Sequence, residues 1–97
     1  MRVRFFAQLR NLTGCAEAEV PYKETVGGLA RSLCDLYGEK FREKIFPQGN
    51  AESPEGAQIG AEIIILINGR HISHLGGVAA PLTPDDRVDI FPVVAGG

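Results

Sequence analysis

The most restrictive feature of the sequence is a short apolar run that is followed at once by a turn signal. Residues 63–67 read IIILI, and Asn68-Gly69 comes directly after them. β-branched residues favour extended strands, and Asn-Gly is a strong short signal for a tight hairpin. The run therefore predicts a well-buried strand, and residues 70–73 can pair back against it as a second, shorter strand.

The start of the chain also reads as a strand, because apolar and polar side chains alternate in RVRFFAQ, residues 2–8. Val3, Phe5 and Ala7 fall on one face, and Phe6 falls on the other with the polar residues. Strict alternation of this kind is typical of a half-buried strand.

Two further segments show the same alternation. Residues 8–14 read as a turn, and residues 16–21 then alternate, which favours a hairpin with the first strand. A last strand is expected over residues 87–92, where Phe91 falls on the polar face. The chain is therefore expected to begin and end its folded part with a strand.

One long segment has helical spacing instead. Thr25 is a suitable N-cap, and Gly38 is placed as the C-terminal cap of a helix that ends at residue 37. Residues 40–46 can add one or two further helical turns. The apolar face of the helix that ends at residue 37 is expected to consist of Val26, Leu29, Ala30, Leu33, Leu36 and Tyr37.

The order strand, strand, helix, strand, short strand, strand is that of an α+β protein with a β-grasp fold. We expect a mixed sheet of about five strands with one main helix packed on one face. The first and last strands would lie side by side in the middle of the sheet. Residues 1–92 would form the domain, with a loop insertion at 47–62, and residues 93–97 would be a flexible Gly-Gly tail.

Composition excludes several classes of function. The 97 residues suffice for one domain, and 10 basic against 12 acidic side chains without a dense Lys/Arg cluster disfavour a nucleic-acid partner. The longest apolar run, residues 63–67, is far too short to cross a bilayer. Charges near the start disfavour a signal peptide, so we expect a cytoplasmic protein without membrane contact.

The sequence offers no cofactor or metal site of its own. Cys15 and Cys34 lack the paired spacing of zinc or redox sites, and His71 and His74 stand in a strand-and-loop region without a third ligand nearby. No glycine-rich phosphate-binding motif occurs, so this chain is not expected to bind ATP by itself. Any chemistry is therefore expected to be shared with a partner.

Two features point to where that partner acts. Phe6 and Phe91 fall on the outward phase of strands predicted to be neighbours, so they are expected to form an exposed aromatic patch. The sequence then ends on Gly96 and Gly97. Glycine has more backbone freedom to lose than any other residue, so folding alone does not explain this ending.

Four segments resemble one family. RVRFFAQLRNLTG, TVGGLARSL, INGR and DDRVDIFPVVAGG are similar to the small subunit of molybdopterin synthase, the MoaD family of ubiquitin-like sulfur carriers, which is related to the thiazole carrier ThiS. The resemblance covers essentially the whole chain except residues 47–62. It implies that an E1-like adenylating enzyme uses ATP to join AMP to the carboxylate of Gly97, and that a sulfur donor enzyme then converts this end to a thiocarboxylate.

The resemblance also implies the later steps. The thiocarboxylate would donate sulfur in molybdenum or tungsten cofactor biosynthesis, together with the large subunit of molybdopterin synthase. Gly96 and Gly97 would thread into partner active sites that exclude side chains. The chain would then be a sulfur-donor subunit and not a self-contained catalyst. The residues implied to contact partners are Phe6, His71, Phe91, Pro92, Val93, Val94 and Ala95.

The chain departs from the family pattern at three of these positions. His71 matches a position that is usually apolar, Val93 replaces a second proline, and Ala95 replaces a hydroxyl residue. Three alternatives stay open. The same carrier chemistry can feed thiazole or another thiolated metabolite; Gly97 can form isopeptide bonds to lysines, as in a protein modifier; or the chain is a plain interaction domain.

Overall fold

The structure is a computed structural model that describes residues 1–47, 59–60 and 62–93. Within these residues, five strands and three α-helices follow one another, with two short 3-10 helices before the last strand. The elements are β1 (Arg2–Phe5), α1 (Gln8–Thr13), β2 (Glu17–Glu19), α2 (Val26–Tyr37), α3 (Glu39–Ile45), β3 (Ile63–Ile67), β4 (Arg70–His71), η1 (Ile72–His74), η2 (Gly77–Ala79) and β5 (Arg87–Pro92).

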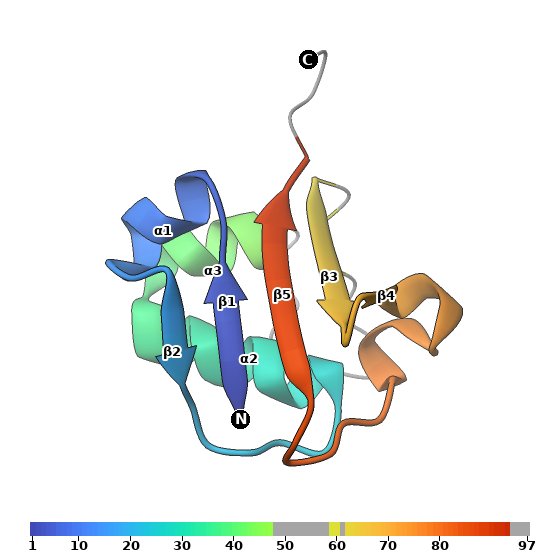
Figure 1. The fold of residues 1–97 in the computed structure, drawn as a ribbon. Helices are drawn as coiled ribbons and strands as arrows, with labels where there is room; N and C mark the ends of the chain where they lie inside the picture. Colours follow the sequence, from blue (N-terminus) through green and yellow to red (C-terminus); the bar gives the residue numbers. More distant parts are fainter. Residues whose placement is uncertain (48–58, 61, 94–97) are drawn as a thin grey trace.

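The five strands form one mixed sheet in the order β2-β1-β5-β3-β4. β1 and β5 pair in parallel at its centre, and the other three pairings are antiparallel. The helices cover one face of this sheet, as Figure 1 shows, and none of the described helices covers the other face. This arrangement is the β-grasp fold, and the expected pairing of the first and last strands is confirmed.

The core lies between the sheet and its helices. Every second residue of the central strands points into it, and α2 and α3 supply the opposite side. All of its largest members are less than 2% exposed, so burial of apolar surface is the main stabilising term of the fold. These members include Val3, Phe5, Leu9, Leu29, Leu33, Phe41, Ile45, Ile65, Val88 and Ile90.

Helix α2 begins and ends where the sequence predicts. Thr25 precedes it, and its Oγ1 accepts a hydrogen bond of 3.1 Å from the backbone N–H of Gly28. Gly38 follows it at φ 94°, a value that favours glycine. One residue of the predicted apolar face is wrong, because Leu36 is 60% exposed. At 100° per residue, the buried stripe is centred near Ala30 and Tyr37, and Leu36 lies outside it.

The predicted turn at residues 8–14 is wrong, because most of it forms helix α1. The chain reverses at Ala7, whose φ is 53°, and the backbone N–H of Leu9 donates to the Phe6 carbonyl over 3.2 Å. This reversal sends Leu9 into the core, where it is 1% exposed. The buried position predicted for Ala7 is also wrong: β1 ends at Phe5, and Ala7 is exposed.

The hairpin predicted from Asn-Gly is confirmed. Asn68 at φ 51° and Gly69 at φ 84° give the positive values that a type I′ turn requires. Asn68 Nδ2 donates to Asp86 Oδ1 over 2.8 Å, and the backbone N–H of Thr83 donates to Asp86 Oδ2 over 2.7 Å. The backbone bond from Thr83, ahead of the bond from Asn68, lowers the pKa of Asp86. This carboxylate therefore ties the hairpin to the loop before β5.

Two other segments differ in extent from the prediction. The strand expected at residues 70–73 ends at His71, because the next residues turn into η1. Most of the predicted insertion at 47–62 lies outside the described residues. Among those described, Gly60 is buried, and its N–H donates to the Ile45 carbonyl over 2.9 Å. No helix in the described ranges is both long and apolar enough to cross a membrane.

Candidate functional site

The sheet face opposite the helices, which we call the outer face, carries an aromatic row at one end. Phe91 of β5 is paired in register with Ile64 of β3, and Phe6 follows the end of β1 on the other side. The rings of Phe6 and Phe91 are 5.8 Å apart between centroids and meet edge to face at 84°. The predicted aromatic pair is thus confirmed, and Phe6, Phe91 and Ile64 define the aromatic row.

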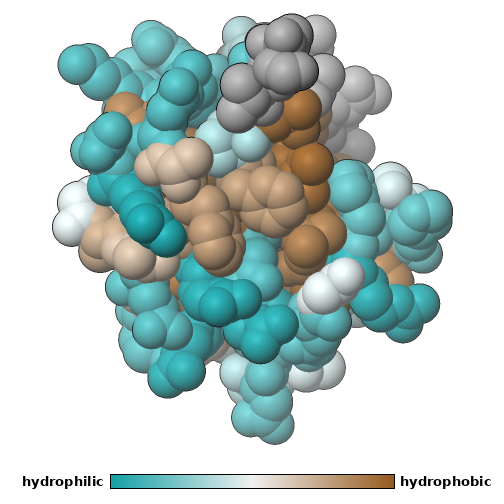
Figure 2. Space-filling model, turned by 45° about the horizontal axis from the view of Figure 1, so that its top comes forward, coloured by the Kyte–Doolittle hydropathy of each residue, from teal (hydrophilic) through white to brown (hydrophobic). Residues whose placement is uncertain are grey.

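The aromatic row forms part of an apolar patch that is open to solvent. All three of its side chains are only half-buried, as is Leu66 further along β3. Figure 2 shows apolar side chains gathered in the middle of the surface when the end of the sheet is turned forward. A contiguous apolar patch of this kind is typical of a protein contact surface.

A charged row crosses the outer face next to the aromatic row. Arg4 and Asp89 are partners in register, and their side chains form a two-bond ion pair: Nε donates to Oδ1 over 2.7 Å, and Nη2 donates to Oδ2 over 3.0 Å. The hydrogen bond to Asp89 raises the pKa of Arg4. Asp89 is only 5% exposed, although it faces the side of the sheet without helices. Arg87 Nε lies 3.7 Å from the same carboxylate.

Two guanidinium groups hold the ring of Phe6. Arg4 Cζ lies 5.4 Å from the ring centroid, and Arg10 Cζ lies 5.8 Å from it. Arg10 is itself fixed, because its Nε donates to the Phe5 carbonyl over 3.1 Å. Cations above an aromatic face attract it electrostatically. The ring is therefore held in one position by Phe91 and the two arginines before any partner binds.

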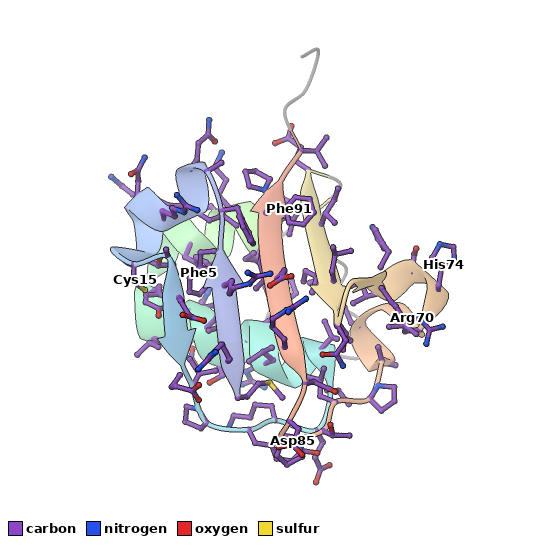
Figure 3. The ribbon with its side chains drawn as sticks, viewed as in Figure 1. Phe5, Cys15, Arg70, His74, Asp85 and Phe91 are labelled. Carbon is purple, nitrogen blue, oxygen red and sulfur yellow. The ribbon has the colours of Figure 1, made fainter. Side chains whose placement is uncertain are left out.

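The last described residues leave the sheet beside the aromatic row. Pro92 is the register partner of Ile63, and the N–H of Val93 donates to the Glu62 carbonyl over 2.6 Å. Val93 is 42% exposed. Figure 3 shows Phe91 near this end of β5. The other residues predicted for the tail, Val94, Ala95, Gly96 and Gly97, lie outside the described residues, and their roles stay predictions.

His71 lies on the same face but at the opposite edge. His71 belongs to the edge strand β4 and pairs with Leu66 of β3. Its Nδ1 accepts a hydrogen bond of 3.0 Å from the N–H of Ser73. Its ring centroid is 6.4 Å from that of His74. Figure 3 shows His74 and Arg70 on the far side of β3 from Phe91. The structure does not bring His71 to the aromatic row, and its contact with a partner stays a prediction.

The described residues contain no group of three His, Cys, Asp or Glu side chains that could hold a metal ion. Cys34 is buried in α2, and this burial raises the pKa of its thiol to about 11. A thiol with such a pKa stays protonated near neutral pH and is a weak nucleophile. Cys34 is therefore a core residue and not a reactive group.

Sequence reasoning missed four residues of the outer face. It treated residues 63–67 as buried throughout, whereas Ile64 and Leu66 are half-buried on the outer side. It also gave no role to Arg4 and Asp89, which are 85 positions apart in the sequence. The signal that finds them is the parallel register of β1 and β5, which places Arg4 opposite Asp89. Local patterns do not contain that register.

Comparison with known proteins decides the family. A family model described as the ThiS family matches residues 3–97. The chain belongs to the ThiS family. A curated family relative, small archaeal modifier protein 3 of Haloferax volcanii, is 33% identical across the whole chain, which covers 98% of that protein.

Solved structures agree with this assignment. The solution structure of small archaeal modifier protein 1 from Methanosarcina acetivorans is 36% identical and superposes with a TM-score of 0.83, covering 99% of this chain and 94% of that one. A putative molybdopterin converting factor, subunit 1, from Pyrococcus furiosus is 29% identical with a TM-score of 0.67, covering 96% and 95%. The fold is therefore the ubiquitin-like β-grasp of sulfur carriers and modifiers. The resemblance to the MoaD family is confirmed at this broader level, and not for molybdopterin synthase in particular.

Proposed function

We propose that this chain is a ubiquitin-like carrier that acts through the carboxylate of Gly97. An E1-like partner would join this carboxylate to the AMP part of ATP and release pyrophosphate, because a free carboxylate is a poor electrophile. A sulfur donor enzyme would then displace AMP and leave a thiocarboxylate. This chain would supply the reacting end, and its partners would supply the catalytic groups.

The observation that carries the proposal is the position of the aromatic row. β5 contributes Phe91 to this row and ends one residue later at Pro92. A partner that binds the outer face at this row therefore has the following residues within reach. Residues 93–97 can span at most about 17 Å, at about 3.4 Å per residue. That length suffices to enter a site inside the partner while the folded domain stays outside.

The sulfur acceptor is proposed to be a precursor of molybdopterin. In this function the chain is the small subunit of molybdopterin synthase, and the large subunit holds the precursor while the thiocarboxylate gives up its sulfur and returns to a carboxylate. The similarity to the putative converting factor of Pyrococcus furiosus supports this proposal. The product would serve in a molybdenum or tungsten cofactor.

A second candidate function is protein modification. The activated carboxyl group of Gly97 would then be attacked by a lysine amine of another protein, which releases AMP and forms an isopeptide bond. Two relatives that are 33% and 36% identical are both named small archaeal modifier proteins, and this favours the second candidate. Both functions begin with the same adenylation and use the same outer face.

The first test measures the intact mass of the protein purified from its own cells without a C-terminal tag. We expect a mass gain equal to the exchange of one oxygen for sulfur, located at Gly97 by fragmentation. A variant that lacks Gly96 and Gly97 is the control and should show no gain. An end that stays unmodified even with the matched adenylating enzyme, ATP and a sulfur donor would contradict the proposal.

A second test separates the two candidates. Cells that express the chain with an N-terminal epitope are examined on a denaturing, reducing gel, and the large synthase subunit is assayed with the thiocarboxylated chain. Larger epitope-bearing bands that vanish in the variant without Gly96 and Gly97 indicate protein modification. Sulfur transfer to the precursor without such bands indicates molybdopterin synthesis. If neither the larger bands nor the sulfur transfer is observed, both candidate functions are wrong.

A further inference from the structure

The turn that joins β1 to α1 is strained at one exposed residue. Ala7 has φ 53° and ψ −129°. With the hydrogen bond from the Leu9 N–H to the Phe6 carbonyl, this geometry matches a type II′ turn with Ala7 at its first central position. That position strongly favours glycine, because the Cβ of an L-residue clashes there. A residue held in such a region costs about 1–3 kcal/mol.

Both ends of this turn are fixed by the rest of the fold. On one side, the N–H of Phe6 donates to the Ile90 carbonyl over 3.2 Å, which holds the turn against β5. On the other side, Leu9 is buried in the core. Arg10 adds a third anchor through its bond to the Phe5 carbonyl. The surrounding contacts therefore impose the strained conformation on Ala7.

Nothing in the described part of the core explains alanine at this position. Ala7 is exposed, and its Cβ is absent from the buried core and from the apolar residues packed against that core. Glycine would adopt the same backbone without the clash. The methyl group therefore lowers stability without a compensating contact in the described core. Ala7 is also the residue directly after Phe6 of the aromatic row.

We infer that Ala7 is a contact residue of the docking surface, and that the methyl group packs against an apolar part of the protein that binds the aromatic row. The inference rests on the proposed function, because it assumes that the protein that binds the aromatic row is the E1-like adenylating enzyme. Its contact with Ala7 is continuous with its contact at Phe6. The turn presents the methyl group in a fixed position, so little freedom is lost when the partner binds.

The test compares Ala7→Gly with the unaltered chain in two measurements. Thermal unfolding should shift upwards by about 4 °C or more, because the relief of strain exceeds the added freedom of the unfolded chain. Binding to the adenylating enzyme, measured by calorimetry, should weaken about fourfold, the effect of losing one buried methyl group. A gain in stability with unchanged affinity overturns the inference, and so does a loss of stability.

Ala79→Gly is the matched control. It makes the same chemical change at an exposed residue of η2, whose φ is not positive and which lies outside the outer face. We expect lower stability and unchanged affinity. If the unaltered chain fails to bind the adenylating enzyme, the proposed function fails together with this inference. If it binds and Ala7→Gly binds equally well, only this inference fails.

A D-alanine at position 7 separates the methyl contact from the stiffness of the turn. Such a chain can be assembled by ligating a synthetic segment 1–14, which ends in Gly14, to a recombinant segment that begins with Cys15. D-alanine favours positive φ and keeps the turn stiff, but it points its methyl group in another direction. Weakened binding supports the contact. If the chain with D-alanine binds as tightly as the unaltered chain, only the stiffness of the turn affects binding, and the inferred methyl contact is overturned.

Discussion

The two faces of the sheet differ along a single strand. In β5, Val88 and Ile90 point towards the helices and are at most 1% exposed, whereas Asp89 and Phe91 point to the outer face. On the helix side, Val88 and Ile90 are part of the apolar core, which the fold needs for stability. The outer side contains an ion pair and an edge-to-face ring pair that hold exposed groups in place. The comparison shows that specific polar and ring contacts, and not burial alone, fix the side chains of the outer face.

The largest effect is expected on the helix side. Ile90→Ala removes buried methyl groups and leaves a cavity, so the free energy of unfolding should fall by about 2–5 kcal/mol. Urea denaturation measures this. Val93→Ala is the control, since that side chain is 42% exposed and its loss should change stability by less than about 0.5 kcal/mol. Equal losses in both variants would abolish the distinction between the two environments.

The ion pair of the outer face should have an intermediate effect. Asp89→Ala leaves Arg4 without the two bonds that it donates, so the free energy of unfolding should fall, but by less than for Ile90→Ala, because solvent reaches Arg4. A double-mutant cycle with Arg4→Ala isolates the coupling between the two side chains. Coupling near zero would show that the pair does not contribute to the stability of the fold.

Phe91→Ala should change stability little and binding strongly. The ring is half-buried, so the free energy of unfolding should fall by no more than about 1 kcal/mol, while affinity for the adenylating enzyme should weaken at least about tenfold. Calorimetry measures the affinity. Leu36→Ala is the control, because Leu36 is an exposed apolar residue of α2, on the covered side of the sheet. Unchanged affinity for Phe91→Ala would remove this ring from the docking surface.

The smallest effect is expected on the pH dependence of stability, through Asp86. The pKa of Asp86 is lowered in the folded state from its ordinary 3.8, first by the backbone bond from Thr83. Its contribution is therefore fully present at pH values above that ordinary pKa and is lost as the pH falls through the folded pKa. Asp86→Asn should be less stable than the unaltered chain at pH 7, and the difference should shrink below about pH 4. Chemical denaturation across this range measures it, and a constant difference would contradict the assignment.

Local patterns predicted the elements that depend on local chemistry. Alternation located β1 and β5, and apolar spacing with Thr25 and Gly38 located α2. The same alternation placed Phe6 and Phe91 on the outer face, so half of the candidate site was predicted. Helix α1 was missed because Leu9 becomes buried only after the unusual reversal at Ala7.

The other half of the site depends on pairings between distant segments. Asp89 appeared to be an exposed strand residue, and only its register with Arg4 explains its burial. Ile64 appeared to be a core residue, and only its register with Phe91 places it on the outer face. Neither register follows from residues that are neighbours in the sequence.

The parallel pairing of β1 with β5 has a consequence for biosynthesis. During translation, β1 is synthesised early. It cannot pair with β5 until the residues of β5, which follow their partners in β1 by more than 80 positions, have also been synthesised. Contacts between such distant segments form late and make folding slow. A nascent chain interrupted before residue 87 would lack the strand that completes the centre of the sheet and would leave unpaired edges that invite aggregation. Because the aromatic row takes one ring from each of these strands' ends, a partner that recognises it would select against such fragments.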